Sequence, residues 1–211
     1  MELNLENLGE RETYSLLTQT IIPRPIAWVL SQNTEITGQN SPTFNLAPFS
    51  FFNGAAAKPP LIMISVGSWD VNGRVKDTLI NIRERKSFTV AIPSFEMNPL
   101  VQDSAAEFAY GESEIDNLGI ELTEWDWFTP KISNCSVNFA CTLKMELEPE
   151  GSSQTLIFAE ISKIDVSDRV VITDEKDRIA IDPLLVDPLL RLGSGKYGRL
   201  GTVESIKRMQ S

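Results

Sequence analysis

Histidine is absent from the 211-residue sequence, and cysteine occurs only twice. The lack of histidine excludes a Ser-His-Asp triad, a Cys-His dyad, a histidine general base and a histidine-ligated zinc site. It also removes the usual axial ligand of haem. We therefore predict no metal site and no catalytic side chain. If the protein is an enzyme, a cofactor carries the chemistry or the reaction needs little proton transfer.

The two cysteines, Cys135 and Cys141, are too far apart to bridge if one strand carries both. At about 3.3 Å per residue they would then lie roughly 20 Å apart. We predict free, buried thiols and a reducing, cytoplasmic location. No apolar run reaches the roughly 20 residues of a membrane-spanning helix. The first residues, Met1 to Glu12, are too polar and acidic for a signal peptide.

Positive charge is scarce: 19 lysines and arginines face 29 acidic residues, which gives a net charge of −10. Non-specific nucleic-acid binding needs clustered cations, so we expect neither a nucleic-acid nor a membrane partner. This net charge still allows an anionic ligand at a place where a few cations and backbone N–H groups converge. Hydrophobic residues make up 42% of the chain, which indicates a packed core.

Short apolar runs separated by turn residues predict about seven strands with few helices between them. This spacing favours an antiparallel barrel or sandwich. We expect an N-terminal arm over 1–20, one domain over 21–201 and a tail over 202–211. The main predicted strands are Ile26–Ser31, Phe44–Asn53, Leu61–Val66, Phe88–Ile92, Ser136–Glu148 and Thr155–Val166, and the main predicted helices are Asp77–Lys86 and Met97–Tyr110. We expect the first two strands to form a hairpin through a turn near Asn33–Asn40, and Ser136–Glu148 to pair with Thr155–Val166.

The segment Phe44–Asn53 is apolar enough for a buried strand, yet it carries Asn45, Ser50 and Pro48. Proline removes a backbone donor and is seldom tolerated in a central strand. One interpretation is an edge strand with a bulge. The other is a strand that bends and turns its backbone and a serine towards a ligand.

The run Lys76-Asp77-Thr78 lies where a helix is expected to begin, with Asp77 as its N-cap. A lysine, a hydroxyl and the free N–H groups of a helix start together favour a phosphate. The alternative is a capped surface helix with a solvated lysine.

Taken together, these stretches and three others resemble the flavin reductase-like FMN-binding split-barrel family, which includes flavoredoxin. The resemblance extends from about Thr20 to Gly201 in the family's order. The motifs are Pro-Arg-Pro-Ile-Ala-Trp-Val (23–29), Asn-Leu-Ala-Pro-Phe-Ser-Phe-Phe-Asn (45–53), Pro-Pro (59–60) with Ile-Ser-Val-Gly (64–67), Lys-Asp-Thr (76–78) with Asn-Ile (81–82), and Arg-Leu-Gly-Ser-Gly-Lys-Tyr (191–197).

The resemblance implies a mainly β fold, a six-stranded Greek-key split barrel that works as a homodimer. Non-covalent FMN would lie at the barrel rim near the dimer interface. The backbone around the isoalloxazine and ribityl chain would come from Asn45, Leu46, Ala47, Pro48, Phe49, Ser50 and Phe51. The phosphate would be held by Ser50, Lys76 and Thr78, with Asp77 capping the helix. Other residues near the flavin would be Trp28, Ser65, Val66 and Gly67, and near the partner's flavin Gly193 and Tyr197.

The resemblance also implies that hydride passes from NAD(P)H to flavin N5 and that electrons continue to an unidentified acceptor, a redox protein or an oxygenase. The protein would mainly position the two rings. A cation near flavin N1 and O2 would stabilise the reduced anion, and Arg24 and Lys58 are candidates. For Arg24 a surface ion pair is the alternative.

Two other functions stay open at this point. In these alternatives the chain is either a flavoredoxin-type FMN electron carrier or a non-catalytic flavin-binding module. The aromatic residues Trp125, Trp127 and Phe128 are a further reason to expect a homodimer, since they pack either in the core or at an interface.

Overall fold

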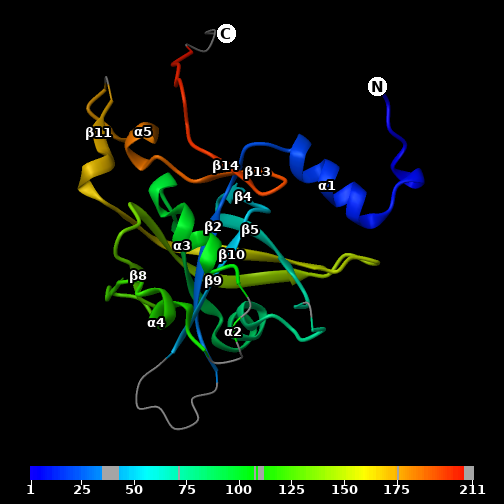
Figure 1. The fold of residues 1–211 in the computed structure, drawn as a ribbon. Helices are drawn as coiled ribbons and strands as arrows, with labels where there is room; N and C mark the ends of the chain where they lie inside the picture. The colour runs from blue at the N-terminus through cyan, green and yellow to red at the C-terminus, as the bar shows by residue number, and fades with distance from the viewer. Residues whose placement is uncertain (35–42, 71, 107, 109–111, 175, 207–211) are drawn as a thin grey trace.

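A seven-stranded antiparallel sheet is the centre of the computed structural model, with the strand order β3-β2-β6-β9-β10-β5-β4. The structure describes residues 1–34, 43–70, 72–106, 108, 112–174 and 176–206 (Figure 1). The strands of this sheet are β2 (Ala27–Gln32), β3 (Phe44–Phe49), β4 (Phe52–Ala57), β5 (Pro60–Gly67), β6 (Ser87–Ile92), β9 (Val137–Leu147) and β10 (Gln154–Val166).

The two edge strands of this sheet, β3 and β4, are consecutive in the chain and are separated only by Ser50 and Phe51. So short a link brings the two edges together, and the sheet therefore curls into a barrel. The Ser65 N–H donates to the Phe51 carbonyl at 2.8 Å across this junction. With β3 and β4 counted as one bent strand, the barrel has six strands. The predicted antiparallel barrel is thereby confirmed.

The segment Phe44–Asn53 has a feature of each interpretation: it begins as an edge strand, and it bends. Pro48 lies in β3, which pairs only with β2, so its missing N–H costs no ladder bond on that edge. The chain bends two residues later, at Ser50 and Phe51.

Short helices and strands surround the barrel (Figure 1). The helices are η1 (Leu5–Asn7), α1 (Glu10–Thr20), α2 (Asp77–Arg85), η2 (Phe95–Met97), α3 (Asn98–Asp103), α4 (Glu114–Leu118), η3 (Asp168–Val170) and α5 (Pro183–Val186). The remaining strands are β1 (Arg24–Pro25), β7 (Leu122–Thr123), β8 (Lys131–Ile132), β11 (Val171–Thr173), β12 (Ile179–Ile181), β13 (Leu190–Gly193) and β14 (Lys196–Gly198). Within the described ranges, no helix is long and apolar enough to cross a membrane.

Strand β2 separates two hydrophobic clusters. Ala27 and Val29 point into the barrel interior, which α2 closes with Leu79 and Ile82. Trp28, on the other face, belongs to a second cluster under α3 and α4. Both faces of β2 are therefore buried, which accounts for its uninterrupted apolar sequence.

Most predicted elements are found, including the pairing of β2 with β3 and of β9 with β10. The predicted turn Asn33–Asn40 between the first pair falls largely outside the described residues. The predicted helix Met97–Tyr110 is wrong at Ser104–Ala106 and Phe108, since α3 ends at Asp103, and its remaining residues 107, 109 and 110 lie outside the described residues. The Ser104 hydroxyl bonds to the Val101 carbonyl, a local contact that competes with continuing the helix.

Three smaller predictions have mixed outcomes. Both cysteines are free and buried as expected, but Cys135 precedes β9 and shares no strand with Cys141. The Trp125 and Trp127 indoles donate to backbone carbonyls of their own chain, which leaves only Phe128 of that aromatic segment largely exposed. The segment therefore packs within the subunit.

The turn between β13 and β14 packs against the last turn of α1 and requires glycine at its first position. Gly193 has φ +81°, and a Cβ there would lie 2.5 Å from the Thr18 carbonyl oxygen. Gly195, in the same turn, has φ +73°, but a Cβ at this position would meet nothing within 4 Å. A side chain would therefore strain the backbone at both positions, but only at Gly193 would it also collide with α1.

We expect Gly195→Ala to lower the free energy of unfolding by about 1–2 kcal/mol, because only the left-handed backbone opposes it. Gly193→Ala should cost about 2 kcal/mol more, because α1 must shift to relieve the overlap. Urea denaturation followed by circular dichroism measures both. Equal losses for the two variants would contradict this close packing of α1.

Candidate functional site

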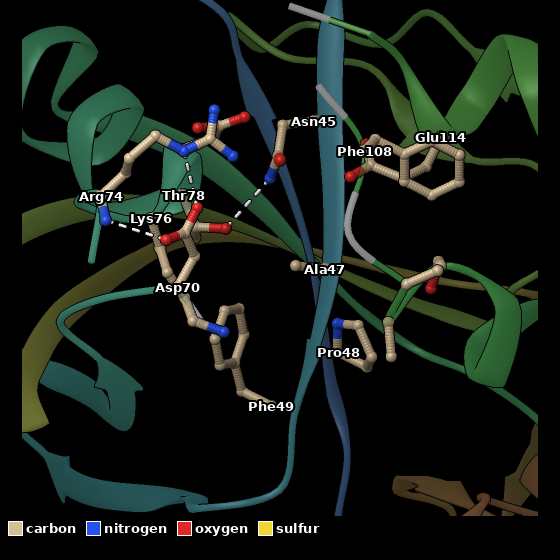
Figure 2. Close-up of a pocket in the computed structure, with 14 residues that line it drawn as sticks. Asn45, Ala47, Pro48, Phe49, Asp70, Arg74, Lys76, Thr78, Phe108 and Glu114 are labelled. Atoms are coloured by element: carbon tan, nitrogen blue, oxygen red, sulfur yellow. Dashed lines mark hydrogen bonds and ion pairs between the residues drawn. The ribbon is translucent and has the colours of Figure 1, made fainter. Parts of the chain in front are cut away.

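A pocket of about 180 Å³ opens beside edge strand β3 (Figure 2). Its walls come from β3, from the loop that leads into α2, and from the segment between α3 and α4. The lining residues are Asn45, Ala47, Pro48, Phe49, Asp70, Arg74, Lys76, Asp77, Thr78, Ser104, Ala105, Ala106, Phe108 and Glu114.

A hydrogen bond between two buried side chains joins β3 to the start of α2. Asn45 Nδ2 donates to Thr78 Oγ1 at 3.0 Å, and both residues are almost fully buried. Two motifs that are 33 positions apart in the chain thus meet in one wall of the pocket. The bond also fixes the orientation of the Asn45 amide.

Lys76 occupies the N-cap position of α2 and is half-buried in the pocket wall. The aliphatic part of the Lys76 side chain passes close to Gly67, the last residue of β5. A Cβ atom added to Gly67 would lie 3.6 Å from Lys76 Cε. Among the residues that the structure describes, its ammonium has neither an ion-pair partner nor a hydrogen-bond partner. No side chain caps the helix. Within the described residues, the N–H groups of Asp77 and Thr78 have no acceptor, whereas the Leu79 N–H donates to the Lys76 carbonyl at 2.9 Å.

These groups form an arrangement that suits a phosphate monoester. The nine-residue helix α2 begins with three kinds of donor. They are the Lys76 ammonium, which has no partner among the described residues, the backbone N–H groups of the first turn, and the Thr78 hydroxyl. Each is a preferred ligand of a phosphate oxygen. Asp77 is the first residue of this helix and is not its N-cap. The predicted capping role of Asp77 is therefore wrong by one position.

A second pair of charges lies at the pocket mouth. Arg74 Nε contacts Asp70 Oδ2 at 2.8 Å, and Asp70 Oδ1 accepts from the N–H groups of Asn72 and Arg74. The hydrogen bonds from Arg74 hold the pKa of Asp70 below its ordinary value. The loop before α2 thus presents a carboxylate and a guanidinium that neutralise each other.

On the opposite wall, Glu114 begins α4 and is 6% exposed. Its Oε2 accepts the Leu46 N–H at 2.9 Å, and the neighbouring Ser113 hydroxyl donates to the Phe44 carbonyl at 2.7 Å. Both bonds use backbone groups on the unpaired side of β3. Burial, with a smaller contribution from the Asp77 carboxylate, raises the pKa of Glu114 to about 7, although the backbone N–H groups of Leu46 and Glu114 lower it.

Seven of the predicted cofactor residues line this pocket: Asn45, Ala47, Pro48, Phe49, Lys76, Asp77 and Thr78. Leu46 lies in the same strand and contacts Glu114 through its backbone. Eight others are not part of this lining: Trp28, Ser50, Phe51, Ser65, Val66, Gly67, Gly193 and Tyr197.

One of these eight residues, Trp28, contacts the pocket lining, and Ser65 and Tyr197 bond to residues outside the lining. The fully buried Trp28 indole donates to the Ser104 hydroxyl at 2.8 Å, and Ser104 lines the pocket. Ser65 Oγ contacts the Gln154 side chain. Tyr197 donates its phenol proton to Gln102 at 2.7 Å. Their roles towards a flavin stay predictions.

Arg24 and Lys58, the candidates for flavin tuning, also lie outside the lining. Arg24 is buried and donates to the carbonyls of Thr18 and Ile21, so it neutralises the C-terminal end of α1. The alternative of a surface ion pair is therefore wrong. Lys58 is exposed in the turn between β4 and β5.

Seven lining residues were missed by sequence reasoning: Asp70, Arg74, Ser104, Ala105, Ala106, Phe108 and Glu114. The Asp-x-Asn-Gly-Arg run over 70–74 is a recognisable turn sequence whose charges converge locally. Glu114 offers no such signal, because its burial arises from packing against β3.

Comparisons with known proteins agree on one family. The family model of the flavin reductase like domain matches residues 19–186. Nitrilotriacetate monooxygenase component B from Bacillus cereus is 29% identical with a TM-score of 0.82, over 98% of each chain. The 2-nitrobenzoate 2-nitroreductase NbaA of Pseudomonas fluorescens is 28% identical with a TM-score of 0.81, over 99% of this chain and 96% of that one.

A third solved structure bears on the fold alone. A split barrel domain protein of Shewanella frigidimarina is 16% identical with a TM-score of 0.79, over 99% of this chain and all of that one. This similarity supports a split-barrel fold for the chain.

The buried carboxyl of Glu114 predicts a pH-dependent stability. Its pKa rises from 4.5 to about 7 on folding, so the folded state binds more protons between these values. The free energy of unfolding therefore falls as the pH rises through this range, by up to about 3 kcal/mol. We expect Glu114→Gln to remove this loss between pH 5 and pH 8.5 in urea denaturation.

The exposed Asp116 on the same helix provides the matched control. Asp116→Asn should retain the wild-type pH dependence. A Glu114→Gln variant that loses stability with pH as the wild type does would show that another group is responsible.

Proposed function

Because the chain belongs to the flavin reductase-like family of split-barrel flavoproteins, we propose that it is an FMN-dependent oxidoreductase. It takes electrons from NAD(P)H and passes them to a separate acceptor. The observation that carries this proposal is the uncommitted Lys76 ammonium at the uncapped start of α2, facing β3 across the pocket.

The residues of the pocket fit FMN. The phosphate is held by Lys76, the first N–H groups of α2 and the Thr78 hydroxyl. Strand β3 would hold the ribityl chain and ring, and its Asn45 presents an amide that Thr78 orients. Pro48 leaves no N–H on the unpaired side of the strand, so this part of the wall is apolar. Asp77 sits close to the phosphate and keeps its proton more readily, because burial raises its pKa.

FMN, when bound, supplies the two-electron chemistry of its isoalloxazine ring. The chain itself positions the ring and the nicotinamide, which matches the absence of histidine. The ion pair between Asp70 and Arg74 lies at the entrance of the pocket and carries no net charge. Phe108 and Ala106 supply apolar surface on the far wall and exclude water from the ring.

Two of the similar solved structures, at 29% and 28% identity, support an enzyme over an electron carrier. One is a component of a monooxygenase and the other a nitroreductase, by their names. We propose for this chain only that it is a redox enzyme, and not the substrates named for those two proteins. An electron carrier remains the second candidate, because flavoredoxins share the fold.

Anaerobic stopped-flow mixing of the FMN-loaded protein with NADH, and then with NADPH, tests the function. We expect rapid bleaching of the visible flavin band with at least one donor. Tight FMN binding without bleaching by either donor would contradict the reductase and favour an electron carrier. Failure to bind FMN at all would contradict both.

Lys76→Ala should weaken FMN binding by about 1.5–3 kcal/mol, because it removes a charge-assisted contact to the phosphate. Titration of the apoprotein by flavin fluorescence measures the change. Lys176→Ala, in the exposed turn between β11 and β12, is the control and should bind as the wild type does. Unchanged affinity in Lys76→Ala would place the phosphate elsewhere.

We also propose that the functional unit is a homodimer. The outer face of β5, β9 and β10 carries six apolar side chains. In β5 and β10 the residues next to them, Ile62, Ile64 and Ile157, point into the core. Met145 pairs with Phe158, which pairs with Met63, so they form one row across three strands. The six residues of this outer face are Leu61, Met63, Met145, Leu147, Leu156 and Phe158.

Met145→Glu should shift the protein to a monomer, because a charge buried at an apolar interface costs several kcal/mol. Met145 is 53% exposed in the single chain, so the change should not unfold it. Ile179→Glu, 85% exposed and outside this face, should leave the mass unchanged. Light scattering after gel filtration reports the mass. A wild-type monomer at micromolar concentration would contradict the dimer.

A further inference from the structure

Among the acidic side chains that line the pocket in the described part of the chain, Glu114 alone is buried. It connects two parts of the site, since its carboxylate holds β3 through the Leu46 N–H while the same side chain lines the pocket. Leu46 lies between Asn45 and Ala47, two lining residues of the flavin wall. A change in the state of Glu114 therefore acts on the strand that the ring would contact.

The described lining of the pocket holds more negative than positive side chains. The lining includes three carboxyl groups, from Asp70, Asp77 and Glu114, and two cations, Arg74 and Lys76. Arg74 is committed to Asp70 by the ion pair at 2.8 Å, which leaves Lys76 opposite two carboxyl groups. With all of them ionised this lining carries a net charge of −1, and a phosphate dianion would bring it to −3. Protonation of one carboxyl group relieves this repulsion.

Glu114 is the carboxyl group best placed to take that proton. It is more deeply buried than Asp77, which is only half-buried. Burial and the nearby Asp77 carboxylate bring the pKa of Glu114 to about 7, although the backbone N–H groups of Leu46 and of Glu114 itself lower it. The other charged groups of its surroundings are Lys76, Arg74 and Asp70 in the loop before α2, and the exposed Glu112 and Asp116 beside it in the chain.

We propose that Glu114 is a proton-linked positioning residue: it holds β3 through Leu46 and takes up one proton from solvent when a phosphate dianion binds beside Lys76. This inference rests on the proposed function, because FMN is the phosphate monoester that the pocket fits. The neutral carboxyl retains an oxygen for the Leu46 N–H, so the strand stays in place as the charge disappears. FMN binding is thereby coupled to pH.

Isothermal titration calorimetry of the apoprotein with FMN tests the coupling. Titrations at pH 7.5 in two buffers of different ionisation enthalpy give the number of protons taken up. We expect about 0.5–1 proton per FMN for the wild type. Between pH 7 and pH 8.5 its Kd should rise about tenfold. The FMN phosphate is already a dianion there, since its second pKa is about 6.

Two variants separate the charge of Glu114 from its hydrogen bond. Glu114→Gln keeps a carbonyl oxygen for the Leu46 N–H and cannot titrate, so it should bind FMN with little proton uptake and a nearly constant Kd. Asp116→Asn removes an exposed charge from the same helix and should behave as the wild type. Thermal unfolding of each variant verifies that it is folded.

The outcomes separate this inference from the proposed function. FMN binding by the wild type without proton uptake and with a constant Kd would overturn the inference alone, whether or not Glu114→Gln folds. A Glu114→Gln variant with the wild-type proton uptake would also overturn it. The absence of any FMN binding would overturn the proposed function instead.

Discussion

The link of two residues between β3 and β4 is the constraint on which the rest of the structure depends. Ser50 and Phe51 join the two edges of a seven-stranded sheet, so the sheet has to close. Closure creates the interior that α2 fills with Leu79 and Ile82. It also places the start of α2 against β3, where Asn45 meets Thr78. The pocket exists because these parts cannot separate without opening the barrel.

An edge strand normally carries unsatisfied backbone groups, and β3 uses three devices to avoid this cost. Glu114 accepts the Leu46 N–H and Ser113 donates to the Phe44 carbonyl. Pro48 has no N–H to satisfy. Two of the three devices come from the start of α4, so the strand and this short helix hold each other in place.

The charges of the pocket are divided between two walls. Near α2, Lys76 is uncommitted and Arg74 is paired with Asp70. Across the pocket, Glu114 is buried where an ionised carboxylate is costly. In the proposed function, the anion would bind at the first wall, and the second wall would adjust its own charge. In a chain with a formal net charge of −10, such local arrangement is what permits an anionic ligand at all.

The sequence by itself determined the fold class, the strand pairs β2–β3 and β9–β10, and the family, because these depend on local patterns and on the order of short motifs along the chain. It also placed seven of the lining residues, which lie within two short motifs. Tertiary structure alone decided the end of α3 at Asp103, the capping role of Arg24 and the burial of Glu114. Each of these depends on contacts between segments that are distant in the chain or on a competing side-chain bond, and no local propensity contains that information.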